Sequence, residues 1–536
     1  MQVQPKGRSR RLGTIVSGSL SDGFVMHLDP THLEQIKSGR FVSIQGSEGA
    51  FFSLVTDIQL DTKNAELLLF PPTAEEELFG ELVRTHYLSA RAVLKPLVML
   101  DRRGSVRPVK TVPAHFAPVF EASEEEIIAI FGEERAERST HFAVGTPIDM
   151  STPVCINLAS FVERSSGIFG KTGTGKTFIT RLLLAGLIRH ERAVCVVFDM
   201  HNEYGLQARA EGGGGHFVKG LKTLFPEKVA IFSLDPESTL RRGVSPDLTV
   251  TIPYQAIHVQ DIVSLYHELN LHPTACEAAS LLAARFRQQW LAQLLASGDR
   301  LKELAADVGA HPESIAALYR KLRQIERLPC FVAQEQGGDQ VIASMMEYLE
   351  RGISVIVEFG TFASTFCYLL LANIITRHIH ALYTAKTELF LGNRLPAYEP
   401  KKLLLVIEEA HKFLNPHAAA QTIFGTIARE MRKYYVSLLI IDQRPSGIES
   451  EVLSQIGTKI VAQLHDENDI AAVLGGVGNA SQLKTVLSTL DSKKQVLLLG
   501  HAVALPIVVE TRSYDETFYA QIAPPIEVDR LISQLF

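Results

Sequence analysis

The sequence predicts an α/β protein in which a small β-barrel precedes a parallel-sheet core, and a helical segment interrupts that core. Three observations support this prediction. Short strand-like runs fill the N-terminal segment, apolar runs alternate with helical patterns from about Ser166 onward, and a long intervening stretch is helical in pattern. The expected divisions are a barrel at 1–100, a linker at 101–160, a core at 161–255 and 346–515, an inserted helical subdomain at 256–345, and a C-terminal tail at 516–536.

The composition is that of an ordinary globular protein. Of 536 residues, 46% are hydrophobic and 21% are charged, so a large core can form without disulfides. The five cysteines are scattered and include no CxxC pair, which favours a reducing compartment and argues against a zinc site. No apolar segment is long enough for a signal peptide or a membrane span, so we expect a cytoplasmic protein with no membrane anchor.

The net charge of −6, from 53 basic and 59 acidic residues, does not indicate a strongly basic nucleic-acid-binding domain. A ring-shaped assembly can nevertheless enclose a basic channel within an acidic exterior. Four basic residues near the glycine-rich segment could face such a channel, although a surface position is the simpler interpretation. These residues are Lys219, Lys222, Arg241 and Arg242.

The N-terminal segment is typical of β structure. Its runs are rich in Val, Ile, Phe and Thr, and turn residues separate them. Five short strands at this spacing favour a small closed barrel, although any small β domain would show the same periodicity. The expected strands are Arg11–Leu20, Phe24–Asp29, Phe41–Gly46, Phe51–Asp61 and Ala65–Phe70, and a helix is expected at Ser123–Phe131.

The core strands are continuous apolar runs, as expected where both faces of a parallel sheet are buried. The helical stretch from Ala256 to Glu350 is rich in Ala, Leu, Gln and Arg, for example at Ala278–Leu295. Its one tryptophan, Trp290, is expected in the core of that segment, and Gly212–Gly215 is expected to form a loop. The core strands are Val194–Asp199, Val229–Leu234, Ser354–Phe359, Leu403–Ile407 and Ser437–Asp442.

The segment Gly170–Thr177 fits the phosphate-binding pattern GxxxxGK[ST], between a short apolar run and the helical pattern of Phe178–Arg189. Its glycines allow backbone N–H groups to turn toward phosphate oxygens, and the helix N-terminus adds partial positive charge. Lys176 would reach the β and γ phosphates, and Thr177 would hold Mg²⁺. The predicted nucleotide-binding residues are Gly170, Thr172, Gly173, Thr174, Gly175, Lys176 and Thr177.

The strand at Leu403–Ile407 ends in two acids, Glu408 and Glu409. In phosphate-loop ATPases one such acid supports Mg²⁺, and a neighbouring acid activates the attacking water. Glu408 is the candidate for the metal role, directly or through water, and Glu409 is the candidate general base. Two glutamates at a strand end are usually solvated, but the phosphate loop favours the catalytic interpretation here.

Three further positions are candidates with open alternatives. Arg429 and Arg432 could act as arginine fingers supplied by a neighbouring subunit, or form a solvated helix face. Gln443 follows a strand, and it could sense the γ-phosphate or simply face water. Asp199 could support the nucleotide site or cap the next turn.

Five segments occur in the order seen in HerA ATPases, which are relatives of FtsK: GKTGTGKT, FDMHNEYG, VIEEAH, AREMRKYYV and IDQRPS. The first hundred residues also resemble the HAS barrel of that family. The resemblance implies a RecA-like phosphate-loop core in a homo-hexamer that uses ATP and Mg²⁺ to translocate on double-stranded DNA. It assigns phosphate and Mg²⁺ binding to Lys176 and Thr177, the base to Glu409 and the sensor to Gln443. It also makes Arg429 and Arg432 trans-acting residues.

The resemblance further implies a partner. HerA proteins often work with the nuclease NurA in DNA-end processing during repair, and similar bacterial ATPases pair with sirtuin-like or nuclease effectors in antiviral defence. The barrel would be the docking site for such an effector. One departure is that the acidic pair, often Asp-Glu in the family, is Glu408-Glu409 here, which could slow turnover.

The leading hypothesis is therefore a motor that translocates on double-stranded DNA. The alternative is an ATP-gated ring scaffold that assembles and regulates an effector enzyme without processive movement. A third possibility, a coupling ATPase of secretion or conjugation, would require a membrane segment or a membrane-docking domain, and the sequence indicates neither.

Overall fold

The computed structural model describes residues 10–29, 36–37, 39–62, 88–135, 138–148, 150–209, 217–333, 338–419, 422–477, 480–491 and 494–523. The chain divides into two compact units, and each is considered by itself. The smaller unit comprises Met1–Glu134, Ala143–Ile156 and Val503–Arg512. The larger unit comprises Arg135–Phe142, Asn157–Ala502 and Ser513–Phe536.

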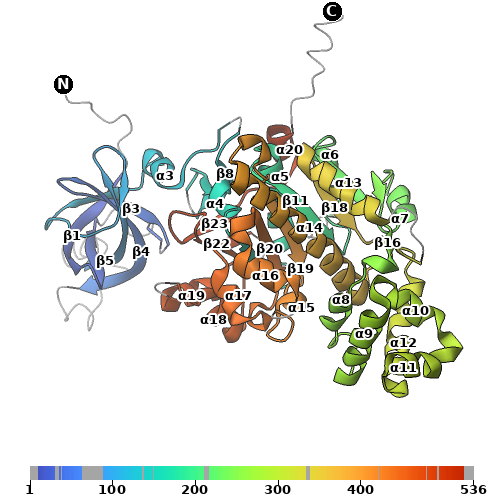
Figure 1. Ribbon diagram of the computed structural model, residues 1–536. Helices are drawn as coiled ribbons and strands as arrows, with labels where there is room; N and C mark the ends of the chain where they lie inside the picture. The colour runs from blue at the N-terminus through green and yellow to red at the C-terminus, as the bar shows by residue number, and fades with distance from the viewer. Residues whose placement is uncertain are drawn as a thin grey trace, which may run out of the picture. The chain divides into compact units, whose positions relative to one another are not determined.

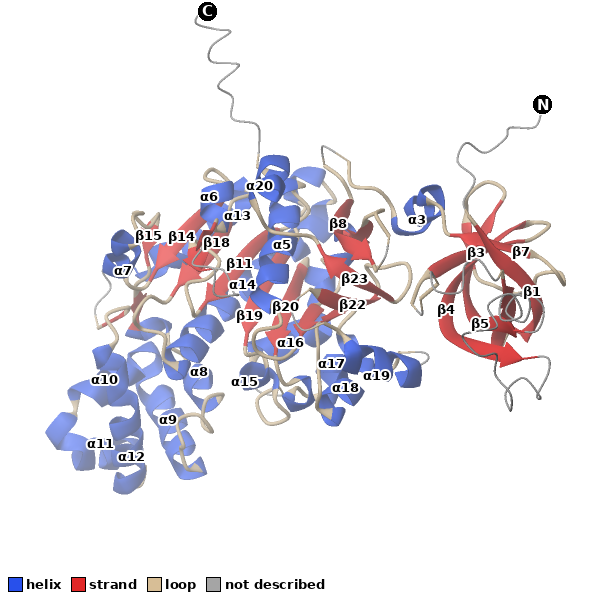
Figure 2. Ribbon diagram, turned by 180° about the vertical axis from the view of Figure 1, so that it is seen from behind, coloured by secondary structure: helices blue, strands red, loops and turns tan. Residues whose placement is uncertain are grey.

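The N-terminal strands form a closed barrel, drawn in blue in Figure 1 and in red in Figure 2. The strand order is β2-β1-β7-β3-β4-β5-β6, and an additional β2–β5 pairing closes the ring. Apolar side chains such as Phe24, Val42 and Val55 fill the interior. The strands are β1 (Arg11–Ser19), β2 (Gly23–Leu28), β3 (Phe41–Gln45), β4 (Gly49–Thr62), β5 (Leu88–Asp101), β6 (Val106–Arg107) and β7 (Pro118–Glu121).

The predicted barrel is confirmed, but its membership differs from the expected set. The first four predicted strands correspond to β1–β4, whereas Ala65–Phe70 lies outside the described residues. The barrel is completed by β5 and by β7, which lies in the expected linker and pairs with both β1 and β3. Pro96 made β5 hard to predict, since proline is disfavoured inside strands. The ladder between β4 and β5 accommodates it beside a register shift between Phe52 and Ser53.

The remainder of the smaller unit begins with α3 (Glu124–Phe131), where a helix was expected. Ser123 caps this helix, and Glu126 completes a reciprocal capping box. Beyond it, β8 pairs with β23 in antiparallel fashion. The strands of this part are β8 (His141–Pro147), β9 (Val154–Asn157) and β23 (Ile507–Thr511).

The larger unit is built on a mostly parallel sheet. Within it the order is β15-β14-β18-β11-β19-β20-β10-β21-β22. All of the pairings from β15 to β21 are parallel, and β22 is added in antiparallel orientation. The strands are β10 (Ser166–Phe169), β11 (Val194–Asp199), β14 (Val229–Ser233), β15 (Leu248–Thr249), β18 (Ser354–Glu358), β19 (Leu403–Glu408), β20 (Val436–Asp442), β21 (Thr458–Val461) and β22 (Gln495–Gly500). The predicted core strands are thus found within one or two residues of their expected bounds.

Two groups of helices cover this sheet (Figures 1 and 2). The helix that follows the phosphate loop, α5, packs against α6 and α20, whereas α14 packs against α13 and α16. The bounds are α5 (Lys176–Arg189), α6 (Leu221–Leu224), α13 (Gly338–Arg351), α14 (Thr365–Asn393), α16 (Ile423–Glu430) and α20 (Glu516–Ile522). Shorter helices in the same unit are α4 (Leu158–Phe161), α7 (Pro236–Arg241), α15 (His411–Leu414), α17 (Ser450–Gln455), α18 (Glu467–Leu474) and α19 (Ala480–Thr489).

The segment between β15 and β18 is largely helical, as the sequence indicates. The continuous helix suggested by Ala278–Leu295 is divided, because α9 ends at Phe286 and α10 begins at Trp290. Trp290 is buried, and its indole N–H donates to the carbonyl of Ile257 (2.9 Å). The helices are α8 (Val259–Val263), α9 (Pro273–Phe286), α10 (Trp290–Ala296), α11 (Leu301–Val308) and α12 (Pro312–Leu322), and the short strands β16 (Ile252–Pro253) and β17 (Phe331–Val332) pair with each other.

Basic residues considered for a channel are largely engaged in ion pairs. Lys219 pairs with Glu516 (2.9 Å), and Lys222 pairs with Asp247 (3.0 Å). Arg242 pairs with the buried Glu358. The structure therefore favours the surface interpretation for these three. Separately, no helix in the described ranges is both long and apolar enough to cross a membrane.

We predict that Gly186→Ala destabilises the protein, although glycine-to-alanine changes inside helices usually stabilise by about 1 kcal/mol. A methyl group on Gly186, in the last turn of α5, would meet the ring of Phe142 at 2.8 Å. Such overpacking typically costs about 1–3 kcal/mol, so the thermal unfolding midpoint should fall. Gly392→Ala is the matched control, because Gly392 lies in α14 with open space around it. An unchanged or raised midpoint for Gly186→Ala would contradict the packing described.

Candidate functional site

The candidate site lies where parallel strands of the larger sheet end. Because β20 lies between β10 and β19, Phe169 is in register with Asp442, and Ile441 is in register with Glu408. The carboxyl ends of parallel strands meet at one edge, where ligands bind in open α/β sheets. This pairing brings together the phosphate loop, the acidic pair and Gln443 from segments far apart in the sequence.

The phosphate loop leads from β10 into α5, in the predicted strand–loop–helix context. Gly173 and Gly175 have φ angles of 77° and 82°, in the left-handed region that favours glycine. Gly170 is closely packed, because a Cβ there would meet the Thr174 hydroxyl at 2.7 Å. The Lys176 ammonium donates to the carbonyls of Gly170 (2.9 Å) and Lys171 (3.0 Å), so it lies over the loop.

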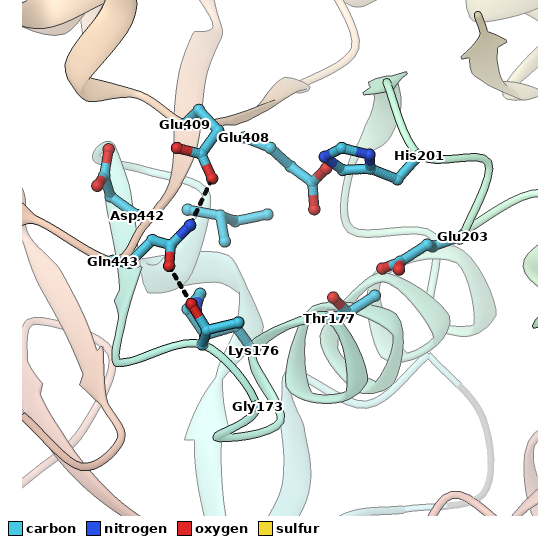
Figure 3. A pocket seen from close by; sticks show the side chains of 11 residues that line it. Gly173, Lys176, Thr177, His201, Glu203, Glu408, Glu409, Asp442 and Gln443 are labelled. Carbon is cyan, nitrogen blue, oxygen red and sulfur yellow. Dashed lines mark hydrogen bonds between the residues drawn. The ribbon is translucent and has the colours of Figure 1, made fainter. Parts of the chain in front are cut away.

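A cleft opens beside this loop (Figure 3). The phosphate loop, the turn after β11 and the ends of β19 and β20 form its walls. The polar side chains of these four segments therefore face the same cleft. The residues lining it are Thr172, Gly173, Lys176, Thr177, His201, Glu203, Glu408, Glu409, Ile441, Asp442 and Gln443.

Glu408 is the last residue of β19, and its side chain is buried. The Tyr204 hydroxyl donates to its Oε1 (2.7 Å), whereas its Oε2 has no hydrogen-bond partner among the described residues. Burial raises the pKa of Glu408 to about 8, although the Tyr204 hydrogen bond opposes the shift. Tyr368 holds the backbone at this position, accepting from the Glu408 N–H (3.0 Å) and donating to the Glu408 carbonyl (3.1 Å).

Glu409 adopts φ = 50°, a left-handed conformation that is unfavourable for a residue with a Cβ. Such strain is found preferentially at functional sites, where it serves to orient a side chain. Here the carboxylate turns toward Gln443, whose amide N–H donates to Glu409 Oε1 (2.8 Å). The Gln443 carbonyl in turn accepts from the Thr172 hydroxyl. A hydrogen-bonded chain therefore connects the phosphate loop to Glu409 through Gln443 (Figure 3).

His411 and Asp442 form a second charged pair at the cleft. The fully buried Asp442 carboxylate accepts from the His411 backbone N–H (2.6 Å) and contacts its ring Nδ1 (2.9 Å). The hydrogen bond with Asp442 raises the pKa of His411. Nδ1 also lies 3.8 Å from the carboxylate of Glu409, so a protonated His411 places positive charge beside this acid.

Asp199 is not among the residues that line the cleft. Its buried carboxylate accepts from the backbone N–H groups of Glu203 (2.8 Å) and Tyr204 (2.8 Å), which is the turn-capping alternative considered from sequence. Burial, followed by repulsion from Glu358, raises the pKa of Asp199 to about 7. Asp199 therefore shapes the turn that places Tyr204 against Glu408.

The donor set fits Mg²⁺ bound together with phosphates. Mg²⁺ typically binds through one or two carboxylates plus substrate phosphate oxygens. The unpaired, buried Oε2 of Glu408 and the hydroxyl-bearing Thr177 line the same cleft. In the described part of the chain, no group of three or more His, Cys, Asp and Glu side chains could hold a metal ion alone.

Of the two candidate finger residues, Arg429 is not among the described residues that line this cleft. Arg429 is half-buried near the end of α16, and its guanidinium donates to the carbonyl of Ala419 (3.1 Å). Arg432 follows in a short 3-10 turn, Met431–Tyr434, and its side chain lies outside the described set. Any catalytic role for Arg429 therefore concerns a site other than the cleft of its own chain.

Four polar residues in or beside the cleft had no role predicted from the sequence. His201 and Glu203 line it, Tyr204 supports Glu408, and Asp442 pairs with His411. All four lie in the segments FDMHNEYG and IDQRPS, and His411 lies in VIEEAH, so their location was visible but their partners were not. Tyr204 and Glu408 are 204 positions apart in the sequence, so their hydrogen bond could not be predicted from spacing.

Comparison with known proteins relates this chain to one family. Residues 142–379 match the family model "Helicase HerA, central domain". The "DNA double-strand break repair helicase HerA" of Sulfurisphaera tokodaii is 22% identical over 90% of this chain and 90% of its own length. That of Sulfolobus acidocaldarius is 25% identical over 79% of this chain and 78% of its own. Among solved structures, VirB4 of Thermoanaerobacter pseudethanolicus has a TM-score of 0.45 at 13% identity, covering 72% of this chain and 98% of that chain.

We predict that Glu409→Gln abolishes most ATP turnover while leaving nucleotide binding intact. Loss of a general base usually lowers kcat by about 10²–10⁴-fold, and the amide keeps the size of the side chain. Turnover and the affinity for a fluorescent ATP analogue would be measured side by side. Glu347→Gln, on the exposed face of α13, is the control and should behave like the parent. Retention of full turnover by Glu409→Gln would remove Glu409 from the base role.

We predict that Tyr204→Phe shifts the acid limb of the pH–rate profile to higher pH. The Tyr204 hydroxyl lowers the pKa of Glu408, so its loss raises that pKa further above its usual range. A larger fraction of Glu408 is then protonated at neutral pH and cannot support a cation. The profile of kcat/KM between pH 6 and pH 9 would be measured at fixed Mg²⁺. Tyr383→Phe, a buried change on α14, should leave the profile unchanged, and an unshifted Tyr204→Phe profile would contradict the proposed coupling.

Proposed function

We propose that this chain is a HerA-type ATPase that hydrolyses ATP to move along double-stranded DNA as a ring of six subunits. The observation that carries this proposal is the cleft itself. A phosphate loop, a buried acid with an unpaired oxygen and a strained second acid face one another there. Several relatives named as DNA double-strand break repair helicases are similar over most of the chain, which supports DNA as the track.

In the proposed reaction the protein acts mainly by positioning charge. Lys176 and the N–H groups of the loop bind the β and γ phosphates of ATP. Glu409 accepts a proton from the attacking water, and its left-handed backbone presents the carboxylate to the cleft. Mg²⁺, held by Thr177 and by Glu408, would neutralise charge on the phosphates when bound.

Gln443 is proposed to sense the γ-phosphate. Its amide holds the carboxylate of Glu409, and its carbonyl accepts from Thr172 of the phosphate loop. A change in the loop when the γ-phosphate binds or leaves is thereby passed directly to the base. Because Gln443 directly follows β20, a shift of its side chain also moves the loop after that strand. This would couple ATP hydrolysis to movement along DNA.

The ring is proposed because Lys176 is the only lysine or arginine among the described residues that line the cleft. Arg429 points to the carbonyl of Ala419 rather than into the cleft of its own chain. A cation supplied by a neighbour would stabilise the transition-state charge, and an arginine finger typically accelerates turnover by about 10³–10⁵-fold. We assign this role to Arg429 or Arg432 of the adjacent subunit.

We further propose that the N-terminal barrel docks a nuclease or another effector enzyme, in DNA-end repair or in antiviral defence. An ATP-gated scaffold is the alternative to a motor, and the two differ in what stimulates ATP turnover. A motor responds to DNA. A scaffold responds to its partner enzyme.

The first test measures ATP hydrolysis with and without linear double-stranded DNA. We expect stimulation by DNA, and we expect Lys176→Ala to abolish turnover in both conditions because the phosphates lose their lysine. Binding to DNA should weaken steeply with added salt, since the contacts are to phosphates. Turnover that ignores DNA would contradict the motor and favour the scaffold.

A mixing experiment tests the shared site. Lys176→Ala and Arg429→Ala subunits should each be inactive alone. When they are mixed, some interfaces combine an intact phosphate loop with an intact neighbouring arginine, so DNA-stimulated turnover should reappear. Mixing Lys176→Ala with Glu409→Gln is the control and should stay inactive, because both changes affect the same half of the interface. Full activity of Arg429→Ala alone would exclude Arg429 as the finger.

A further inference from the structure

Two helices of the inserted segment, α11 (Leu301–Val308) and α12 (Pro312–Leu322), are joined by a very short turn. Gly309 ends α11 with φ = 69°, a left-handed position that glycine adopts readily. The N–H of Ala310 then donates to the carbonyl of Ala305 (2.9 Å), which closes the helix end. His311 caps α12, and Pro312 begins it. Only three residues therefore separate the end of the first helix from the start of the second.

One face of this helix pair is a closely packed core. The inward face of α12 packs against α9 and α11, and α9 packs against α11 in turn. Small residues such as Ala305 and Ala279 are fully buried where the helices approach, which allows close contact between them. Outside the core, the Arg285 guanidinium on α9 pairs with Asp307 on α11 (3.2 Å). The buried residues of α12 are Ser314, Ile315, Leu318 and Leu322.

The opposite face of α12 carries a different set of side chains. Glu313 and Arg320 are exposed, and Ala316 and Ala317 between them are partly exposed. The spacing of these four residues places them along one side of the helix. Two alanines at the centre leave the helix backbone approachable, while polar side chains stand at either end. In Figure 1, α11 and α12 lie side by side in the yellow-green part of the ribbon, next to α9.

The charge of this region is opposite to that of the whole chain. Between Arg285 and Arg327 there are eight Lys and Arg residues and five Asp and Glu residues, whereas the complete sequence has 53 and 59. Within the described residues, four exposed cations near the two helices form no ion pair with a carboxylate. They are Arg300, Lys302, Arg320 and Lys321. Cations without protein partners at both ends of the helix pair are suited to contact phosphates on either side of a groove.

We propose that α9, α11 and α12 form a helix–turn–helix unit that binds double-stranded DNA by inserting α12 into the major groove. The groove is about 12 Å wide and admits one α-helix, while the preceding helix lies across the backbone. Ala316 and Ala317 would approach the base edges, where alanine contacts thymine methyl groups. Arg320 would reach guanine or a phosphate, and Lys302 would contact the backbone beside α11.

This unit is separate from the ATP cleft and from any DNA track through a ring. Binding by α12 needs neither nucleotide nor a free DNA end, because it uses the outside of the duplex. A motor with such a unit would hold DNA at a second point while the ring moves. The inference therefore does not depend on translocation, and its test can succeed or fail independently of the motor.

The experiment uses the full-length protein without nucleotide and a fluorescent duplex of about 25 base pairs, long enough for one such unit, whose two ends are closed by hairpin loops. A ring cannot load over closed ends. Fluorescence anisotropy is measured for the parent and for Ala317→Glu and Arg320→Ala. Each variant has a control matched in charge. Ala284→Glu on the exposed side of α9 matches Ala317→Glu, and Arg327→Ala beyond α12 matches Arg320→Ala. Circular dichroism verifies that every variant is folded, and basal ATP turnover does so for the variants outside the phosphate loop.

We expect Ala317→Glu and Arg320→Ala to weaken binding by about tenfold or more, because one blocks the groove and the other removes a base or phosphate contact. The two controls and Lys176→Ala should bind within about twofold of the parent, a margin typical of changes outside the contact surface. Equal binding by the parent and folded Ala317→Glu would overturn the proposal, as would an equal loss with Ala284→Glu. DNA-independent ATP turnover would contradict the motor while leaving this result intact.

Discussion

The insertion of β20 between β10 and β19 is the constraint on which the site depends. Parallel pairing sets Phe169 beside Asp442 and Glu408 beside Ile441, so three strands end at the same level of one sheet edge. A shift of one residue in either ladder would turn the strand-end side chains to the other face of the sheet. The phosphate loop, Glu409 and Gln443 can converge only because this register holds. The apolar strands, buried on both faces, provide that register.

The buried carboxylate of Glu408 is the clearest conflict between stability and function in this structure. Removing a carboxylate from water is unfavourable unless partners compensate, and here one oxygen is compensated by Tyr204 while the other is not. Burial of the charged form is unfavourable, and this is why the pKa of Glu408 is raised. Asp199 organises the turn that carries Tyr204, so a second buried acid supports the first one. Groups held in this way are typical of sites that await a charged ligand.

The chain combines a catalytic core with modules that have interiors of their own. The barrel closes through β5 and β7 around a cluster of buried apolar side chains. The helical insertion has its own core around Trp290 and the inward face of α12. Independent cores let each module keep its shape while the nucleotide site changes state, which suits an enzyme that couples ATP to contacts elsewhere.

The sequence by itself determined the α/β core, the phosphate loop and the positions of five core strands, whereas β15, β21 and β22 were not predicted. These features are local, because glycine φ preferences, continuous apolar runs and helix caps act over a few residues. The helix at Ser123–Phe131 was predictable for the same reason, since Ser123 and Glu126 satisfy each other's backbone groups. Pro96 and the shortness of β7 concealed two barrel strands, whose partners are distant in the chain.

Only the tertiary structure decided how the site residues meet. Thr172 and Gln443 are 271 positions apart, and no spacing rule relates Tyr204 to Glu408. It also placed the Asp199 carboxylate on the turn after β11 and not among the described residues that line the cleft. Such contacts depend on the order and register of strands in the sheet. That order results from the burial of apolar surface across the whole core, so it is a property of the complete chain and not of any segment.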